Sequence, residues 1–455
     1  MKIPKIIYSS AAVILLFTAC STKTVEQKQV KPTVEKTYQT YEKIQDVKPM
    51  SKEEIQIEEQ SYNSNFSKNE KDFLEILKTD KYASLCGSKD EYLSILELQD
   101  SKEQSKRLGE LFYTYTKNLS NSCINQSAFK KKLKQRKYRD INQDYEVYNV
   151  NINKEKLLKK YTSNTQSVKN ILEIYTPKHP QFFALIKKLD KKALSQSKYN
   201  KLRLNIERLK LLKYSNNDNF IQLNVPSYNF AFYEDGKKTK SFGTVVGSKE
   251  AQTPILSSKL AYFIVNPTWN IPDSIAKSSI IPKALKDKNY LRKKNIVIRK
   301  NYRLDSKKIK WKDVKWKKYL KKDVKYIPYK FIQLPSRTNG MGRMKFIFPN
   351  DYAVYMHDTI GTWRFKSNKQ KIRFDSHGCI RLEHPVSLMK YLSKNYTKYS
   401  YSKVRSIYDS SKTDTIRLNK KLGIHLTYQT AQVNNGKLSF YSDVYGYDKI
   451  QNLNF

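Results

Sequence analysis

Apolar residues recur every three or four positions along the first half of this chain. The spacing is clearest in three stretches between residues 66 and 215. These stretches are Phe73, Ile76 and Leu77, then Leu108, Leu111, Phe112 and Tyr115, then Leu202, Ile206 and Leu209. Such spacing places apolar side chains on one face of an α-helix. We therefore predict a helical scaffold domain over residues 66–215, in which no group of residues is typical of catalysis.

The pattern changes at Phe220, where short runs rich in β-branched and aromatic residues begin. These runs are Ile221–Val225, Tyr228–Tyr233, Phe242–Val246, Leu260–Val265, Lys345–Phe348 and Ala353–Met356. Turn residues separate them, including Asp235-Gly236, a dipeptide that favours hairpins. We expect a mostly β domain over residues 219–405, so the fold class is α+β.

The last fifty residues continue the β pattern after a helical stretch at Leu388–Leu392. We expect residues 406–455 to extend the β domain and to end in two strands, Ile424–Tyr428 and Leu438–Tyr441. Asn434-Asn435-Gly436 would form the turn that joins these two strands.

The first twenty residues have the pattern of an export signal. Lys2 and Lys5 precede an apolar core, Ala11–Phe17, and Thr18-Ala19-Cys20 closes it with small residues. The core is shorter than the roughly 20 residues that span a bilayer. This pattern resembles a bacterial lipoprotein signal (1–20) in which Cys20 is lipidated, except that Phe17 stands where Leu is usual. Cleavage near Ala19 and release of the protein is the alternative.

Residues 21–65 are rich in Lys, Glu, Gln, Thr and Ser and contain few large apolar residues. This composition is typical of a disordered tether.

The whole chain carries 87 Lys and Arg against 42 Asp and Glu, a formal net charge of +45. Such an excess is typical of nucleic-acid binding. In an exported protein we expect no nucleic acid, and the charge instead favours carboxylates and phosphates of the cell wall and membrane surface.

The chain has four cysteines. Besides Cys20 and Cys379, discussed below, Cys86 and Cys123 lie in the predicted helical domain. In an oxidising compartment they would pair as a disulfide, whereas two buried free thiols are the alternative. The sequence does not decide between these two states. No group of Cys and His has the spacing of metal ligands, so no metal site is expected.

The residues that carry candidate chemistry are Ser376-His377-Gly378-Cys379-Ile380-Arg381, with His357-Asp358 upstream. A thiol is a good nucleophile as thiolate, and a nearby imidazole is the usual base that generates it. Gly378 has no side chain, so backbone amides around it can approach a substrate oxygen closely.

Several motifs, in this order, resemble the L,D-transpeptidase (YkuD-type) family, and in particular its larger periplasmic crosslinking branch. They are Asn224-Val225-Pro226, Asp235-Gly236-Lys237, Asn266–Pro272, Arg343–Asn350, Tyr355–Thr359 and Ser376–Arg381. The resemblance extends from about Asn205 to the C-terminus and implies a sandwich-like, mostly β catalytic domain. It does not include a recognisable copy of the separate peptidoglycan-binding module of the larger relatives.

The resemblance also implies roles for individual residues. Cys379 is the expected nucleophile and His357 the general base and acid. Backbone N–H groups around Gly378 and Cys379 would stabilise the oxyanion, and His377 would shape that pocket or serve as a structural histidine. Arg381 would hold a substrate carboxylate or form an internal ion pair. The remaining candidates are Ser376, expected to fix the turn, and the pocket walls Tyr355, Trp269 and Asn270.

A lysine-rich insertion over residues 283–335 carries Trp311, Trp316 and Tyr319. In the family a segment at this point caps the active site. A basic, aromatic lid would suit a sugar–peptide substrate with free carboxylates. A solvated surface above two packed tryptophans is the alternative.

The implied activity is transfer between peptidoglycan stem peptides, which forms 3-3 crosslinks through a Cys thioester without a cofactor. The same machinery would serve an L,D-carboxypeptidase, in which water resolves the thioester and tetrapeptides become tripeptides. A wall-binding lipoprotein without activity is a third reading. The expected partners are stem peptides, a bacterial membrane through the lipid anchor, and other wall-synthesis proteins, all in the periplasm.

Overall fold

The computed structural model describes residues 66–136, 145–189, 194–212, 219–324, 326–366, 373–451 and 453. All of these belong to one of the chain's two units, Ile44–Phe455. The predicted signal, Cys20 and the predicted tether lie outside the described residues. No helix within the described ranges is both long enough and apolar enough to span a bilayer.

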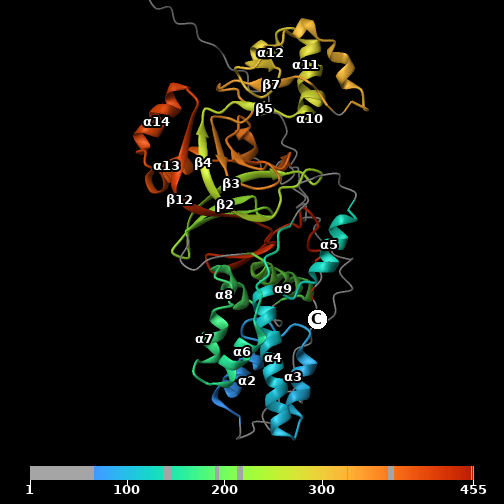
Figure 1. The fold of residues 1–455 in the computed structure, drawn as a ribbon, viewed down its shortest axis with the longest axis vertical. Coiled ribbons are helices and arrows are strands. Elements are labelled where there is room, and N and C mark those ends of the chain that lie inside the picture. Colours follow the sequence, from blue (N-terminus) through green and yellow to red (C-terminus); the bar gives the residue numbers. More distant parts are fainter. Residues whose placement is uncertain are drawn as a thin grey trace, which may run out of the picture. The chain divides into compact units, whose positions relative to one another are not determined.

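The first described part is helical (Figure 1, blue to green). Its helices are α2 (Lys68–Lys78), α3 (Lys89–Leu96), α4 (Ser101–Asn121), α5 (Gln126–Lys134), α6 (Lys154–Thr162), α7 (Val168–Glu173), α8 (Gln181–Ile186) and α9 (Gln196–Lys210). Local sequence sets their starts. Ser67 and Glu70 form a capping box at α2, and the Asp100 carboxylate accepts hydrogen bonds from two N–H groups of α4.

The apolar faces of these helices share one core. Phe73, Phe112, Tyr115 and Tyr161 lie at its centre, where the Phe112 and Tyr161 rings stack 4.3 Å apart.

Helix α9 differs from the others because all of its residues from Leu202 to Lys210 are buried. Its charged side chains are therefore paired: Glu207 with Lys210 at 2.8 Å, and Arg208 with Asp448 at 2.7 Å.

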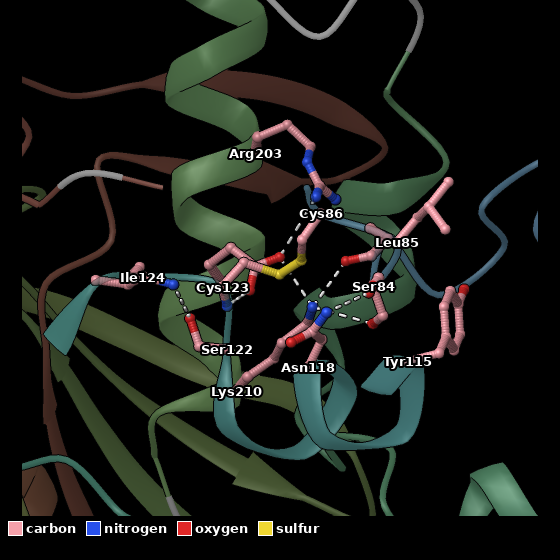
Figure 2. Close-up of a disulfide and its surroundings, with 12 residues drawn as sticks. Ser84, Leu85, Cys86, Tyr115, Asn118, Ser122, Cys123, Ile124, Arg203 and Lys210 are labelled. Atoms are coloured by element: carbon pink, nitrogen blue, oxygen red, sulfur yellow. Dashed lines mark hydrogen bonds and ion pairs between the residues drawn. A yellow bond between two sulfur atoms is a disulfide. The ribbon is translucent and has the colours of Figure 1, made fainter. Parts of the chain in front are cut away.

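A disulfide joins Cys86, in the loop between α2 and α3, to Cys123 after α4 (Figure 2). Their Cα atoms lie 6.1 Å apart. The Cys123 N–H donates to the Glu207 carboxylate at 2.7 Å, and the Lys210 ammonium donates to the Ala83 carbonyl at 2.7 Å. The structure thus selects the paired state, which the sequence had left open.

The second part is built on a nine-stranded sheet. Its strands are β1 (Phe220–Asn224), β2 (Asn229–Glu234), β3 (Lys237–Gly247), β4 (Leu256–Val265), β8 (Met344–Ile347), β9 (Met356–His357), β10 (Phe374–Ser376), β11 (Ile380–Leu382) and β12 (Asp414–Thr427). The order is β10-β3-β11-β9-β8-β4-β12-β1-β2, and β2 also pairs with β3. The sheet therefore closes on itself, which removes most free edges. Helices in one part and strands in the other confirm the α+β prediction.

Two further helices, α13 (Pro385–Tyr396) and α14 (Tyr401–Ser410), lie between β11 and β12 in the chain. Strand β12 runs between β4, antiparallel, and β1, parallel, so the C-terminal red ribbon in Figure 1 lies among yellow-green strands. The predicted pairing of Ile424–Tyr428 with Leu438–Tyr441 is wrong. Asn434-Asn435-Gly436 instead joins β13 (Ala431–Asn434) to β14 (Lys437–Phe440).

A small subdomain is inserted between β4 and β8 (yellow to orange in Figure 1). It contains β5 (Trp269–Ile271), α10 (Asp273–Ile275), the π-helical turn η2 (Ala276–Ile280), α11 (Ile281–Lys286), α12 (Tyr290–Lys293), β6 (Ile296–Arg299), the 3-10 turns η3 (Trp311–Asp313) and η4 (Trp316–Leu320), and β7 (Lys330–Gln333). Its strands form a separate sheet, β5-β7-β6. The subdomain has its own hydrophobic core, in which Trp316 and Tyr319 are buried. The Trp311 ring stacks on the Trp316 ring with the ring centres 4.9 Å apart.

Candidate active site

The turn between β10 and β11 carries the motif residues His377, Gly378 and Cys379. Gly378 has φ +95°, a conformation that side chains with a Cβ rarely adopt. Cys379 is the free cysteine of the described chain. It faces a cavity of about 600 Å³. The lining residues are Trp269, Pro272, Ile275, Ser278, Ser279, Gly340, Met341, Tyr355, His357, Thr359, Ile360, Gly361, Trp363, Arg364, Ser376, His377, Cys379 and Arg381.

Most of the residues predicted from the sequence meet in this cavity. Seven line it: Cys379, His357, His377, Tyr355, Ser376, Arg381 and Trp269. Gly378 lies between two of them in the turn. Asn270 is exposed on β5, pairs with Ile332 and is not among the lining residues. Ser376 is buried and donates its hydroxyl to the Cys379 carbonyl at 2.6 Å, so it braces the turn.

Strand pairing brings His357 to the cavity. His357 pairs with Arg381 of β11 and with Lys345 of β8. Its Nδ1 lies 2.6 Å from the Asp358 carbonyl oxygen. A carbonyl only accepts hydrogen bonds, so this contact favours the neutral tautomer that has its proton on Nδ1 and its lone pair on Nε2. Burial lowers the pKa of His357 to about 3, helped by the positive charge of Arg381. The ring is therefore neutral at neutral pH.

The Asp358 side chain fixes the end of β9. Its carboxylate accepts hydrogen bonds from the N–H groups of Arg343 at 2.8 Å and of Thr359 at 2.7 Å. Gly342 packs so closely against this carboxylate that a Cβ would overlap it, and its φ is +63°. The Asp358 carbonyl orients the His357 ring, and the hydrogen bonds of the Asp358 carboxylate thus hold this carbonyl in place.

Several polar groups surround the Cys379 thiol. Burial raises the pKa of Cys379, whereas hydrogen bonds from the main chain and hydroxyl of Tyr355 and the charges of Lys345 and Arg381 oppose this. The Lys345 ammonium lies 3.8 Å from the centre of the Tyr355 ring. Among the described residues no carboxylate forms an ion pair with Lys345, and no hydrogen bond joins the His357 ring to Sγ. The resting pair is therefore a neutral thiol and a neutral imidazole.

The cavity rim combines exposed apolar side chains with a chain of charges. Ile360 and Trp363 are 54% and 56% exposed although both line the cavity. The Asp375 carboxylate lies 2.9 Å from Arg364 and 3.3 Å from Arg381. Two guanidinium groups share one carboxylate, so the rim keeps a net positive charge toward the cavity.

Sequence reasoning did not single out Lys345, Trp363 or Arg364. Lys345 alternates on β8 with the buried Met344 and Phe346, a period of two that places it on the opposite face and could have revealed it. Trp363 and Arg364 lie in the 3-10 turn η5 (Thr362–Lys366), for which the local sequence gave no comparable signal.

The predicted lid contributes differently from the expectation. None of the described residues of 283–335 is among the lining residues. The wall on this side comes from Trp269, Pro272, Ile275, Ser278 and Ser279 and from Gly340 and Met341. Trp316 and Tyr319 are buried in the subdomain core, which agrees with the packed-tryptophan alternative. The inserted core thus supports the wall from behind, since β5 pairs with β7.

Comparisons with known proteins concern mainly the second part of the chain. Residues 218–405 match the family model YkuD, the L,D-transpeptidase catalytic domain. A curated protein of Haemophilus influenzae named "Putative L,D-transpeptidase" is 31% identical over 255 residues, which cover 56% of this chain and 49% of that protein. The chain therefore matches about half the length of this relative.

The solved structures that this chain resembles include L,D-transpeptidases. The one from Mycobacterium smegmatis is 13% identical, with 46% of this chain and 58% of that chain covered and a TM-score of 0.21. An Enterococcus faecium L,D-transpeptidase is 11% identical, with 48% and 51% covered and a TM-score of 0.19. The family model and the curated relative together show that residues 218–405 of this chain match the L,D-transpeptidase catalytic domain of the YkuD type.

Proposed function

We propose that this protein is a peptidoglycan L,D-transpeptidase that forms 3-3 crosslinks between stem peptides. The observation that carries the proposal is one cavity that contains a free thiol, a neutral imidazole with a lone pair on Nε2, and a positively charged rim. The substrate is the tetrapeptide stem, whose third residue is a diamino acid and whose fourth is D-Ala.

In the first half-reaction, Sγ of Cys379 attacks the carbonyl carbon of the third stem residue. The thiol proton passes to Nε2 of His357, because a neutral thiol must lose its proton as the C–S bond forms. The tetrahedral intermediate collapses, the imidazolium returns the proton to the leaving nitrogen, and D-Ala departs as an amine. A thioester between Cys379 and the shortened stem remains.

In the second half-reaction, the side-chain amine of a neighbouring third residue attacks the thioester carbonyl. His357 accepts a proton from this amine and passes it to the departing Sγ, which restores the thiol. The product is an amide between two third-position residues. All proton transfers use groups of the chain and substrate, so the proposed reaction requires no metal or organic cofactor.

Stem peptides carry free carboxylates, and the rim provides suitable partners. Arg381 and Arg364 share Asp375, so a substrate carboxylate can compete for either guanidinium with bidentate hydrogen bonds. The exposed Trp363 and Ile360 offer an apolar surface beside these charges for the stem or the attached sugar.

Covalent labelling tests the nucleophile. A carbapenem carries a strained amide carbonyl that a thiolate opens to a thioester, so it should add to the wild-type protein and not to Cys379→Ala in intact-mass measurements. Cys379→Ala should retain the wild-type melting temperature within a few degrees. An adduct on Cys379→Ala, or a wild-type protein that stays unmodified, would remove the basis for the proposal.

An L,D-carboxypeptidase is the competing function, because water can resolve the same thioester. Incubation with disaccharide tetrapeptide separates the two: a transpeptidase releases D-Ala and forms a dimer, whereas a carboxypeptidase gives only tripeptide at every substrate concentration. A protein that does neither and still binds cell-wall material would instead be an inactive wall-binding lipoprotein.

The proposed site of action is the periplasm, with the chain anchored to a bacterial membrane through lipidated Cys20. Support comes only from the N-terminal sequence pattern. Cys20→Ala should move the protein from the membrane to the soluble fraction and abolish labelling with a fatty-acid analogue. A soluble wild-type protein with an unmodified N-terminus would contradict the anchor.

A further inference from the structure

The peptide bond between Gly378 and Cys379 is held from the side opposite to the cavity. The Thr253 hydroxyl donates to the Gly378 carbonyl oxygen at 2.8 Å and accepts from the Gly247 N–H at 2.9 Å. Thr253 is fully buried and is not among the cavity-lining residues, whereas Cys379 is. The Gly378 carbonyl therefore points into the protein interior.

This contact fixes the direction of the next N–H group. In a trans peptide the carbonyl and the following N–H point in opposite directions, and the chain has no cis peptide bond among its described residues. With the Gly378 carbonyl directed to Thr253, the Cys379 N–H is directed away from Thr253, toward the cavity side. No acceptor for this N–H occurs among the described residues, so it is free to bind a substrate oxygen.

Tyr445, from the C-terminal segment, fixes Thr253 in turn. Its hydroxyl donates to the Gly247 carbonyl at 2.8 Å and accepts from the Thr253 N–H at 3.1 Å. Tyr445 is fully buried, and its own N–H donates to the Tyr428 hydroxyl at 2.8 Å. Gly247 allows this approach because a Cβ there would overlap the backbone of residues 251–253. Thr253, Gly247 and Tyr445 thus form a closed hydrogen-bonded ring behind the catalytic turn.

We propose that Thr253 is a positioning residue for acyl transfer, which orients the Cys379 N–H as an oxyanion donor, and that Tyr445 holds Thr253 in place. The inference rests on the proposed function, since an oxyanion forms only when Sγ attacks a carbonyl. Donors already aimed at the developing charge need no reorganisation during the reaction, and removing one typically costs 10²–10³-fold in rate.

Two thiol reagents separate positioning from general damage. A carbapenem reacts through a tetrahedral oxyanion, whereas iodoacetamide alkylates a thiolate by direct displacement without one. For the full-length Thr253→Val variant, which keeps the shape and loses the hydroxyl, we expect carbapenem acylation of Cys379 to slow about 10- to 100-fold. Alkylation by iodoacetamide should stay within about twofold of the wild-type rate.

Two further variants serve as controls. Thr253→Ser keeps the hydroxyl and should restore most of the acylation rate, and Tyr445→Phe, which loses only its hydroxyl, should show the same selective loss to a smaller extent. Wild-type acylation by Thr253→Val, or equal losses with both reagents in Thr253→Val and Tyr445→Phe, would overturn the inference. A wild-type protein that the carbapenem never acylates would instead contradict the proposed function.

Discussion

Lys345 places a positive charge beside the partly buried thiol of Cys379. Burial lowers the pKa of Lys345, and the Cys379 thiolate opposes that shift. The Lys345 ammonium lies over the Tyr355 ring. The Tyr355 hydroxyl in turn forms a hydrogen bond with Cys379. The cation and the hydroxyl both favour the thiolate over the thiol. We infer that these two residues offset part of the desolvation of the nucleophile.

Replacing either residue should make the thiol harder to ionise. In Lys345→Met a positive charge is lost, so the pKa of Cys379 should rise further, and Tyr355→Phe should raise it as well. Because only the thiolate is alkylated, the rising limb of the iodoacetamide rate profile should move to higher pH, with a lower rate near neutral pH.

Lys259→Met is the matched control, since Lys259 is an exposed lysine on the neighbouring strand β4. Its rate profile should coincide with that of the wild type. A Lys345→Met profile that also coincides with the wild type would show that the ammonium does not act on the thiol.

At the scale of elements, the inserted subdomain supports the cavity wall. Strand β5 begins at the wall residue Trp269 and pairs with β7, and Phe331 of β7 packs against Trp316 with ring centres 5.2 Å apart. Trp316 is 3% exposed. Truncating a buried tryptophan costs about 3–5 kcal/mol through lost contacts and a cavity.

Trp316→Ala should therefore loosen the wall without touching Cys379. We expect a several-fold higher KM for stem peptides with little change in iodoacetamide alkylation, and faster proteolysis within residues 269–335. Trp363→Ala, at the exposed rim, serves as comparison: it should raise KM without increasing proteolysis. A Trp316→Ala variant with wild-type KM would show that the subdomain does not hold the wall.

The disulfide stabilises the helical part by closing a loop. Cys86 and Cys123 are separated by 37 residues, for which chain entropy gives about 4 kcal/mol of stabilisation. Cys86→Ser with Cys123→Ser should lower the melting temperature by several degrees, and a reducing agent should lower that of the wild type but not that of the double variant. Equal melting temperatures with and without reductant in the wild type would contradict the bond.

The sequence predicted elements whose apolar residues are regularly spaced, and it missed elements without such spacing. The first half of β12, Asp414–Lys421, is largely exposed and polar, so only its buried end at Ile424 was recognised. Cys379 and His357 were found because a local motif carries them. Arg364 and Asp375 are 11 positions apart in the sequence and meet only in the folded chain. Thr253 contacts the backbone carbonyl of Gly378, which lies 125 positions later in the sequence.

At the scale of the whole molecule, three buried histidines make the folding stability depend on pH. Burial lowers the pKa of His179 to about 4 and those of His357 and His425 to about 3. In the unfolded chain these three histidines bind protons near pH 6.5. In the native protein they bind protons only near or below pH 4. Stability is therefore lost as pH falls from about 6.5, and this loss levels off below about pH 3.

At pH 5 each histidine should cost about 2 kcal/mol of stability relative to pH 7. Urea unfolding followed between pH 7 and pH 4 measures the effect. His179→Gln should reduce the pH dependence by about one proton, because one of the three buried neutral histidines is lost. A stability that is constant from pH 7 to pH 5 would contradict the buried neutral histidines.

The position of β12 affects how the molecule is made. Phe220 of β1 pairs with Gly423 of β12, on the order of 200 residues later in the chain. During synthesis β1 and β4 emerge long before the strand that belongs between them, so the gap stays open until β12 has been made. The nascent protein therefore presents unpaired strand edges while these residues are made, and such edges favour aggregation unless collapse is delayed or a chaperone covers them.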